Sequence, residues 1–220
     1  MPELCVYALA SRLAGPAAPG RISVRGVLGE PLQAVRIGPI DAIVGRVRAI
    51  PKPTDSNLRR YSRVMSALWR RTPALLPARF GTSARDLADL QVMIRSRERT
   101  LRRSLRAVRN RAQMTVRLVT KGEPDTARAT PKGKQSGTQY LRARQRAYAV
   151  PSFAPLRAAV RRWIRDERVE KRGGVASIYH LVPRGSADRY ESAIQEAART
   201  AGVRMILSGP WPPYAFADIW

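Results

Sequence analysis

The sequence predicts an α+β protein with two domains and a short tail rich in proline and aromatic residues. Three observations support this prediction. Short β-branched segments separated by glycine and proline fill residues 21–47, an apolar repeat of helical period fills residues 83–110, and strand-like and helix-like segments alternate in the second half of the chain. We therefore expect an N-terminal domain at residues 1–82, a C-terminal domain at residues 83–209 and a tail at residues 210–220.

The N-terminal domain is predicted to consist mainly of strands. Residues 4–9 are a short apolar run, and residues 21–47 have the composition of a meander or a set of hairpins. A helix is expected over residues 57–71 because one of the polar residues at 54–56 can cap it, and residues 74–82 then read as a strand ending in a turn. The apolar residues of that helix share one face: Leu58, Tyr61, Met65 and Leu68.

The strongest periodic signal predicts one long amphipathic helix over residues 84–110. Its apolar residues recur every seven positions, at Leu87, Ile94, Leu101 and Val108. Ser83 and Asp86 resemble a capping box at its start. A second stripe on this helix is cationic and consists of Arg95, Arg99, Arg102, Arg106 and Arg109. We expect the apolar stripe to pack on a core or a partner helix, with the guanidinium groups along its rim.

The next segments continue the alternation of strand and helix. Residues 112–120 alternate as a strand, and residues 121–137 are polar, charged and rich in helix breakers, which predicts a flexible loop. A helical pattern follows from residue 138 and continues to the glycine pair at 173–174, with a bend near Pro151 and Pro155.

The last part of the C-terminal domain adds strand, helix and strand at residues 175–182, 186–202 and 203–207. The helix is expected to face inward through Ala187, Tyr190, Ile194, Ala197 and Ala201. The domain therefore reads as an open sheet with long amphipathic helices on one face.

Charge is the most unusual feature of the composition. The chain has 41 Lys and Arg against 16 Asp and Glu, a formal charge of +25, and 36 of the 41 cations are arginine. Such a balance favours nucleic acid, anionic lipid or an acidic protein as a partner, although arginine enrichment is also typical of a GC-rich genome. Residues 95–111 lack the aromatic side chains of a single-strand binding platform, so nonspecific polyanion binding is the expectation.

The residue inventory argues against an enzyme. A single cysteine, Cys5, and a single histidine, His180, cannot build a zinc site, an iron–sulfur cluster or an internal disulfide. His180 lies in an apolar strand, which favours a structural role. Asp166, Glu167 and Glu170 alternate with cations, which favours an ion-paired, solvated face over a catalytic carboxylate pair. We expect no catalytic residue, no metal and no cofactor.

No run of the sequence approaches the roughly 18 apolar residues that a membrane-spanning helix needs. The first residues lack the basic and long apolar regions of a signal peptide, so an intracellular protein is expected. Residues 181–186 spell LVPRGS, which is identical to a thrombin cleavage motif, and we interpret it as a native loop that thrombin would cut where exposed.

The tail has the composition of a docking segment. Its sequence GPWPPYAF, residues 209–216, places three aromatic residues among three prolines. Prolines withhold the backbone donors that a helix or a central strand requires, so we expect polyproline II conformation and docking through the rings. Two interpretations stay open: the tail clasps the protein's own core, or it binds an apolar surface of a partner. The residues concerned are Trp211, Pro212, Pro213, Tyr214 and Phe216.

Four segments together resemble the gas vesicle protein L/F family. They are the N-terminal LCVYAL strand, LPARFGT at residues 76–82 before a long helix and strand, GTQYLRAR at 137–144, and GPWPPYAF at 209–216. Their order and spacing cover nearly the whole chain. The resemblance implies a cytoplasmic, gas-vesicle-associated accessory protein without enzymatic activity, in which the N-terminal domain has ferredoxin-like character.

The resemblance also implies partners. Family members are thought to contact the small hydrophobic shell protein and other accessory proteins as a scaffold or chaperone. The residues that match the family's motifs are Arg79, Phe80, Gly81, Thr82, Tyr140, Leu141, Trp211, Pro212, Pro213 and Tyr214. The alternative hypothesis is an arginine-rich nucleic-acid-binding protein that uses the helix at residues 84–111 and the loop at residues 121–137.

Overall fold

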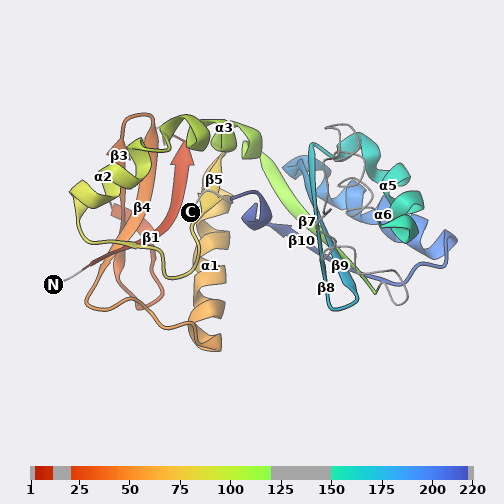
Figure 1. Cartoon of the computed structure of the whole chain (residues 1–220), viewed down its shortest axis with the longest axis horizontal. Helices are drawn as coiled ribbons and strands as arrows, with labels where there is room; N and C mark the ends of the chain where they lie inside the picture. Colours follow the sequence, from red (N-terminus) through yellow and green to blue (C-terminus); the bar gives the residue numbers. More distant parts are fainter. Residues whose placement is uncertain (1–2, 12–20, 120–149, 218–220) are drawn as a thin grey trace, which may run out of the picture. The chain divides into compact units, whose positions relative to one another are not determined.

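The computed structural model describes residues 3–11, 21–119 and 150–217 (Figure 1). The chain divides into two compact units. The first unit comprises Met1–Arg111 together with Trp211–Trp220, and the second comprises Ala112–Pro210. Each unit contains its own sheet and its own helices, which confirms the predicted α+β class with two sheet regions.

The first unit is built on one sheet. Its strands are β1 (Glu3–Ser11), β2 (Arg21–Arg25), β3 (Pro31–Ile37), β4 (Ile40–Val47), β5 (Leu75–Pro77) and β6 (Ser83–Ala84). The strands lie in the order β2-β3-β4-β1-β5, with β6 paired to β1. β1 runs antiparallel to both β4 and β5. The predicted strand at residues 4–9 and the predicted meander at residues 21–47 are therefore confirmed.

Three helices cover this sheet: α1 (Asp55–Arg71), α2 (Leu87–Arg95) and α3 (Glu98–Val108). α1 begins after Thr54, whose Oγ1 accepts a hydrogen bond from the backbone N–H of Asn57 at 3.3 Å. α1 packs against β2 and β5, α2 against β3 and β6, and α3 against β1 and β5. Consecutive residues of β1 are buried, so both faces of this strand are covered.

The predicted long helix at residues 84–110 is wrong as one continuous element, because the segment divides into α2 and α3. At the break, the backbone N–H of Arg97 donates to the carbonyl oxygen of Ile94 at 3.1 Å. The hydroxyl of Ser96 donates to the carbonyl oxygen of Met93 at 3.1 Å, and such side-chain bonds compete with the helical ladder. The apolar spacing does not reveal this break, because Ile94 before it and Leu101 after it are both buried and keep the seven-residue repeat.

The cap of α2 also differs from the predicted capping box of Ser83 and Asp86. Ser83 lies in β6, and Asp86 is the N-cap itself, since its carboxylate accepts from the backbone N–H of Asp89 at 2.8 Å. The Asp89 carboxylate in turn accepts from the backbone N–H of Arg85 at 3.0 Å. The cap thus lies three residues later than predicted, and the Asp89 carboxylate bonds the residue before the N-cap instead of the N-cap itself.

The first unit extends beyond the boundary predicted at residue 82. α3 buries Leu101, Leu105 and Val108 and packs on β1 and β5, so this helix belongs to the core of the first unit. The sheet of the first unit therefore takes two of its three covering helices, α2 and α3, from residues that were predicted to belong to the second domain. The second unit begins at Ala112.

The described elements of the second unit follow the order strand, helix, strand, strand, helix, strand. They are β7 (Arg111–Val119), α5 (Ala154–Val160), β8 (Asp166–Arg172), β9 (Val175–Pro183), α6 (Ala187–Thr200) and β10 (Met205–Trp211). The sheet has the order β10-β7-β9-β8, and α5 and α6 contact each other on one side of it (Figure 1). The predicted strands at residues 112–120 and 175–182 and the open sheet with helices on one face are confirmed.

Both sheets share the strand order of ferredoxin-like folds. When β2 and β6 of the first unit are left out of the count, β5-β1-β4-β3 and β10-β7-β9-β8 both read 4-1-3-2 in the numbering of their own unit. In each unit a helix, α1 or α6, joins the third of these strands to the fourth. The ferredoxin-like character that the resemblance implied for the N-terminal domain is thus a feature of the second unit as well.

The helix predicted from residue 138 to the glycine pair ends earlier. Short 3-10 turns at Pro151–Phe153 and Arg161–Trp163 flank α5, and β8 is a strand. Gly173 and Gly174, with φ of 57° and 73°, form the tight turn that joins β8 to β9, with Arg172 opposite Val175. The predicted loop at residues 121–137, together with Tyr140 and Leu141, lies outside the described residues.

Two smaller differences concern the end of the chain. In α6 the buried residues are Ala187, Tyr190, Ile194 and Ala198, so Ala198 takes the inward position predicted for Ala197 and Ala201. The last strand, predicted at residues 203–207, reaches Trp211 and includes Pro210.

Candidate partner-binding surfaces

The tail folds back onto the first unit. Pro212 and Pro213 are buried, and Phe216 is only 5% exposed. A 3-10 turn at Tyr214–Phe216 packs against β5, so the chain does not continue as polyproline II after Trp211. The described part of the tail therefore forms an intramolecular clasp, which was one of the two interpretations of its sequence.

Tyr61 of α1 lies where the clasp meets the segment after β5. Its hydroxyl donates to the carbonyl oxygen of Ala78. Its ring stacks on Tyr7 with centroids 6.0 Å apart and meets the edge of Phe80 at 5.4 Å. Burial raises the pKa of Tyr61 far above its ordinary value, so the hydroxyl stays protonated and remains a donor.

Tyr214 brings the tail to the same turn of α1. Burial raises the pKa of Tyr214 to about 12, and a hydrogen bond with Ser62 opposes that shift. Because Ser62 follows Tyr61, the aromatic residues Phe80 and Tyr214 both lie beside this turn of α1. Two motifs that are far apart in the sequence, LPARFGT and GPWPPYAF, are thus brought together in the first unit.

Exposure divides the candidate residues of these motifs into two groups. Pro212, Pro213 and Phe216 are buried and build the clasp. The remaining candidates are accessible: Arg79 is exposed, Phe80 and Tyr214 are half-buried, and Trp211 is 40% exposed. We refer to these four accessible residues, Arg79, Phe80, Trp211 and Tyr214, as the clasp surface: Phe80 and Tyr214 lie beside the same turn of α1, Arg79 precedes Phe80 in the chain, and Trp211 precedes the buried Pro212. The remaining candidate, Tyr140, is not among the described residues.

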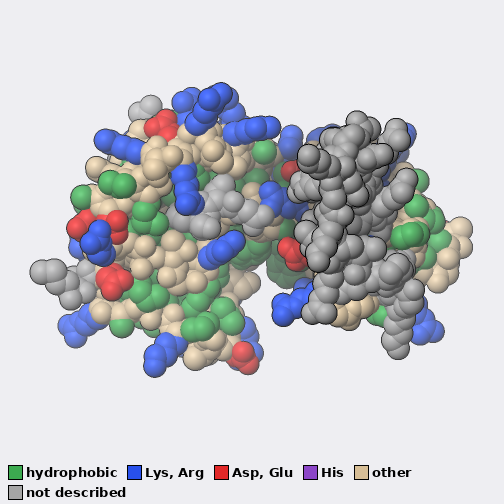
Figure 2. Space-filling view, viewed as in Figure 1, with side chains coloured by type: hydrophobic (Ala, Val, Ile, Leu, Met, Phe, Trp, Pro, Cys, Tyr) green, Lys and Arg blue, Asp and Glu red, His purple; other side chains and the backbone are tan. Residues whose placement is uncertain are grey.

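A cationic face lies on α3. At 100° per residue, five arginines fall within one sector about 120° wide, beside the stripe that packs on the sheet. We call this set the arginine face: Arg99, Arg102, Arg103, Arg106 and Arg109, all of them exposed. Figure 2 shows cationic side chains gathered over α3.

The arginine face differs from the predicted cationic stripe at two positions. Arg95 lies on α2, before the break, and so does not share the helix of the others. Arg103, which the sequence analysis missed, lies beside Arg99 and Arg106 and joins the face. A helical-wheel projection of α3 that takes every arginine within one sector would have identified Arg103, whereas following a single line of arginines along the helix did not.

Glu98 is the acidic residue within α3. Its Oε1 lies 3.7 Å from Nη1 of Arg102, and the two side chains are 37% and 49% exposed. Water and salt screen a pair this open, so it contributes little to stability. The arginine face therefore keeps a strong net positive charge.

A polar network around the buried His180 in the second unit was not predicted from the sequence. Nε2 of His180 lies 2.8 Å from Oε2 of Glu167, and its Nδ1 lies 2.6 Å from the hydroxyl of Tyr190. The same Glu167 oxygen accepts from Nε of Arg157 at 2.9 Å. The hydrogen bond from His180 holds the pKa of Glu167 below its ordinary value, and the guanidinium of Arg157 adds to this effect.

The network links α5, β8, β9 and α6, so it ties the helices to the sheet. His180 is fully buried, which gives a substrate no access to its imidazole and is consistent with the structural role expected for it. Of the acidic residues predicted to lie on a solvated face, Glu167 is half-buried in this network, whereas Glu170 accepts a hydrogen bond from the hydroxyl of Tyr179 at 2.9 Å.

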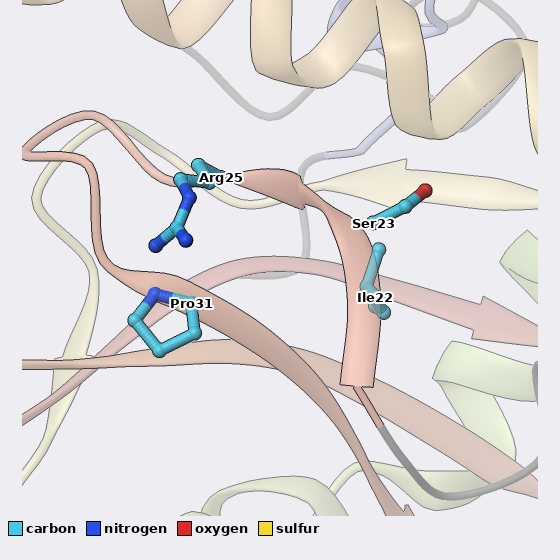
Figure 3. Close-up of a pocket in the computed structure, with 4 residues that line it drawn as sticks. All are labelled: Ile22, Ser23, Arg25 and Pro31. Atoms are coloured by element: carbon cyan, nitrogen blue, oxygen red, sulfur yellow. The ribbon is translucent and has the colours of Figure 1, made fainter.

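Two surface hollows carry no recognisable chemistry. One, of about 390 Å³, is lined by Ile22, Ser23, Arg25 and Pro31 at β2 (Figure 3). In Figure 3 the guanidinium of Arg25 turns toward Pro31 while the hydroxyl of Ser23 points elsewhere, so these donors do not converge on a ligand. The second hollow, of about 450 Å³, is lined by Arg162, Trp163, Asp188, Arg189, Ser192 and Ala193.

In the part of the chain that the structure describes, no three His, Cys, Asp or Glu side chains are grouped as metal ligands. Within the same residues, every helix is too short or too polar to cross a lipid bilayer. Cys5 is buried, and burial raises the pKa of its thiol to about 11, so the thiol stays protonated near neutral pH.

Similarity to known proteins agrees with this architecture. Gas vesicle protein F2 of Halobacterium salinarum is 24% identical over 203 residues, which cover 90% of this chain and 86% of that protein. The crystal structure of GvpF from Anabaena sp. PCC7120 superposes with a TM-score of 0.74 at 11% identity and full coverage of both chains. GvpF from Microcystis aeruginosa gives 0.73 at 12% identity, covering 98% of this chain and 99% of that one.

The two crystal structures support the fold, because at such low identity a structural likeness speaks for the fold alone. The sequence model of the family described as gas vesicle synthesis protein GvpL/GvpF matches residues 4–218. That span runs from the first strand to the tail, so it takes in both sheets, the clasp surface and the arginine face. Because the family model matches nearly the whole chain, the chain belongs to the GvpL/GvpF family of gas vesicle synthesis proteins.

Proposed function

We propose that this protein is a non-enzymatic accessory protein of gas vesicle assembly, which binds the hydrophobic shell protein in the cytoplasm as a scaffold or chaperone. Membership of the GvpL/GvpF family supports the link to gas vesicles. The observation that carries the finer proposal is the clasp surface, where two motifs of the chain meet and leave aromatic side chains accessible.

The chemistry of the clasp surface suits an apolar partner. Trp211 is 40% exposed, and Phe80 is half-buried. Removing apolar surface from water yields about 25 cal/mol per Å², and tryptophan, tyrosine and arginine are the residue types that most often dominate binding energy. A hydrophobic shell subunit held against these rings would have less apolar surface available for aggregation.

Buried clasp residues support the accessible ones. Pro212, Pro213 and Phe216 are buried and anchor the tail, so the accessible Trp211 and Tyr214 belong to a segment that is packed in place. A preorganised surface loses less conformational entropy when a partner binds. Other accessory proteins of the vesicle are further candidate partners of the same surface.

The test is retention of the shell protein by tagged protein after co-expression. The double variant Phe80→Ala/Trp211→Ala should retain at most about a tenth as much shell protein as the wild type, because both accessible rings are lost. The matched control is Leu87→Ala/Val92→Ala on α2, which removes exposed apolar side chains elsewhere in the first unit. Thermal melting of each variant verifies that it is folded. Equal retention by the double variant and the control would count against the clasp surface.

Family membership gives no support to the alternative hypothesis of nucleic-acid binding. Its sequence basis, the cationic stripe, is considered below as a surface in its own right.

A further inference from the structure

The arginine face is a dense, ordered array of cations. α3 has 11 residues, so it is about 16 Å long, and five guanidinium groups project from one sector of it and of its C-cap. Glu98 is the acidic residue of the helix, and it reaches Arg102 through an open pair. Holding like charges this close costs free energy in the isolated protein, and that cost is relieved when an anionic partner binds.

We propose that the arginine face is a docking site for an acidic helix of a partner protein, one that carries Glu or Asp at every third or fourth residue. Arg99, Arg102, Arg106 and Arg109 follow one another at spacings of three, four and three. This spacing repeats the helical pitch of about 5.4 Å along the axis. Carboxylates with the same spacing on a second helix repeat at the same pitch, so several pairs form in register.

The chemistry of arginine adds to this match. A guanidinium group binds a carboxylate through two parallel hydrogen bonds, which fixes orientation as well as charge. A row of such groups on a rigid helix therefore selects for the spacing of a partner's carboxylates, and a diffuse cationic surface would not.

A second copy of this chain does not fit as the occupant. The chain carries a charge of +25, so two copies repel each other. The acidic residues of its described helices are mixed with arginines, as in α6, where Glu196 pairs with Arg199. None of the described helices offers an acidic stripe.

Membranes and single-stranded nucleic acid fit less well than an acidic helix. The exposed uncharged residues of α3 are Thr100 and Ala107, so the face offers no bulky apolar side chain to insert into a bilayer. It also offers no aromatic ring on which a base could stack. The arginine face therefore lacks both the apolar side chains that insert into a bilayer and the aromatic rings that stack on bases.

This surface is independent of the clasp surface. The two share no residue, and the arginine face lies on α3 whereas the clasp surface is formed after β5 and in the tail. A failure of shell-protein retention in the clasp variants leaves the arginine face untested, and a failure at the arginine face leaves the clasp surface untested. The two experiments thus report on different claims.

The experiment measures binding of two labelled synthetic helical peptides to the full-length protein by fluorescence anisotropy. Both peptides have the same composition. In the first, four glutamates follow one another at spacings of three and four residues, and in the second they are distributed around the helix. At about 0.15 M ionic strength, where the Debye length is about 8 Å, the striped peptide should bind at least about tenfold more tightly.

Two charge-matched variants locate the site. The first replaces Arg99, Arg102, Arg106 and Arg109 by Gln. The second replaces four exposed arginines elsewhere in the first unit by Gln: Arg48, Arg59, Arg63 and Arg70. We expect the first variant to lose at least about tenfold in affinity for the striped peptide and the second to lose less than about threefold.

Three outcomes would overturn the proposal. Equal affinity for the two peptides would mean that the spacing of the glutamates does not affect binding. Equal losses in the two variants would mean that only net charge matters. A single-stranded oligonucleotide of equal charge that binds more tightly than the striped peptide, and loses affinity only in the α3 variant, would assign the face to nucleic acid.

Discussion

Glu167 and His180 face each other across the β8–β9 ladder, and the carboxylate of Glu167 receives both the imidazole of His180 and the guanidinium of Arg157. The imidazole is fully buried, and its other nitrogen bonds the hydroxyl of Tyr190. Glu167 thus connects helix α5, through Arg157, to strand β9, through His180. Its ionised state is part of the fold of the second unit.

The first prediction concerns Glu167→Gln and acid. The pKa of Glu167 is lowered in the folded protein, so its stabilising effect is fully present above the unfolded pKa of about 4.3 and is lost as pH falls through the lower folded value. At pH 7 the free energy of unfolding of the variant should be lower than that of the wild type by about 1.5–3 kcal/mol, the range for a hydrogen bond to a charged group. Urea unfolding, followed by a spectroscopic signal of the second unit, measures the difference in free energy of unfolding between variant and wild type at pH 7 and below about pH 4. The difference should be smaller at the acidic pH. A difference that does not change with pH would contradict it.

The second prediction concerns Tyr61→Phe. The change removes the hydroxyl that donates to the carbonyl oxygen of Ala78 and leaves that oxygen, which belongs to a buried residue, without this donor. We expect a loss of about 1–3 kcal/mol in the free energy of unfolding. The control is Tyr179→Phe, whose hydroxyl bonds Glu170 at the surface and whose loss should cost less than about 1 kcal/mol. Thermal melting compares the two; similar losses would argue against the role of Tyr61.

The third prediction concerns the LVPRGS segment. Leu181 and Val182 are buried in β9, and Arg184–Ser186 is a 3-10 turn that leads into α6. A protease must draw its substrate into an extended strand, and here that would require β9 to leave the sheet. Folded protein should therefore resist thrombin under conditions that fully cut a synthetic LVPRGS peptide. Gel electrophoresis over a time course reports the result, and cleavage at the peptide's rate would contradict it.

The fourth prediction concerns the place of α3 in the first unit. Leu101 is 3% exposed and belongs to the stripe that packs on β1 and β5, so Leu101→Ala should cost about 2–5 kcal/mol. Val92 on α2 is 68% exposed, and Val92→Ala should change stability by less than about 0.5 kcal/mol. Denaturant unfolding of the full chain measures both. A small effect of Leu101→Ala on the free energy of unfolding would instead indicate that α3 is not part of the first unit's core and that this unit ends near residue 82.

Local pattern was sufficient to predict most elements. The apolar run at residues 4–9, the helix after Thr54 and the strands at residues 112–120 and 175–182 were predicted correctly from spacing and caps. β8 was read as helix because its alternating charges fit a solvated helical face equally well. The following Gly173-Gly174 pair was taken as a helix end, although two glycines between two short segments are also a hairpin signal.

Two kinds of feature could not be predicted: a helix break that leaves the apolar spacing unchanged, and relations between distant segments. The first is the division of α2 from α3, where the hydroxyl of Ser96 donates to the carbonyl oxygen of Met93. The pairing of Glu167 with His180 depends on strand register, which is set by the whole sheet. The tail residues and Arg79–Phe80 were named as candidates from the sequence, and their binding role stays a prediction, but only the fold distinguishes buried anchors such as Pro212 from accessible residues such as Trp211.

The chain leaves the first unit at Arg111 and re-enters it at Trp211. A ribosome releases the N-terminal residues first, so the nascent first unit waits, with the surface beside Tyr61 uncovered, until translation has passed through the entire second unit. Pro212, Pro213 and Phe216, which cover that surface, follow the second unit in the chain. Closure of the first unit therefore requires residues that follow the whole second unit in the chain, and a product that stops before Trp211 would carry an open apolar seam of the kind that exposes a protein to proteases.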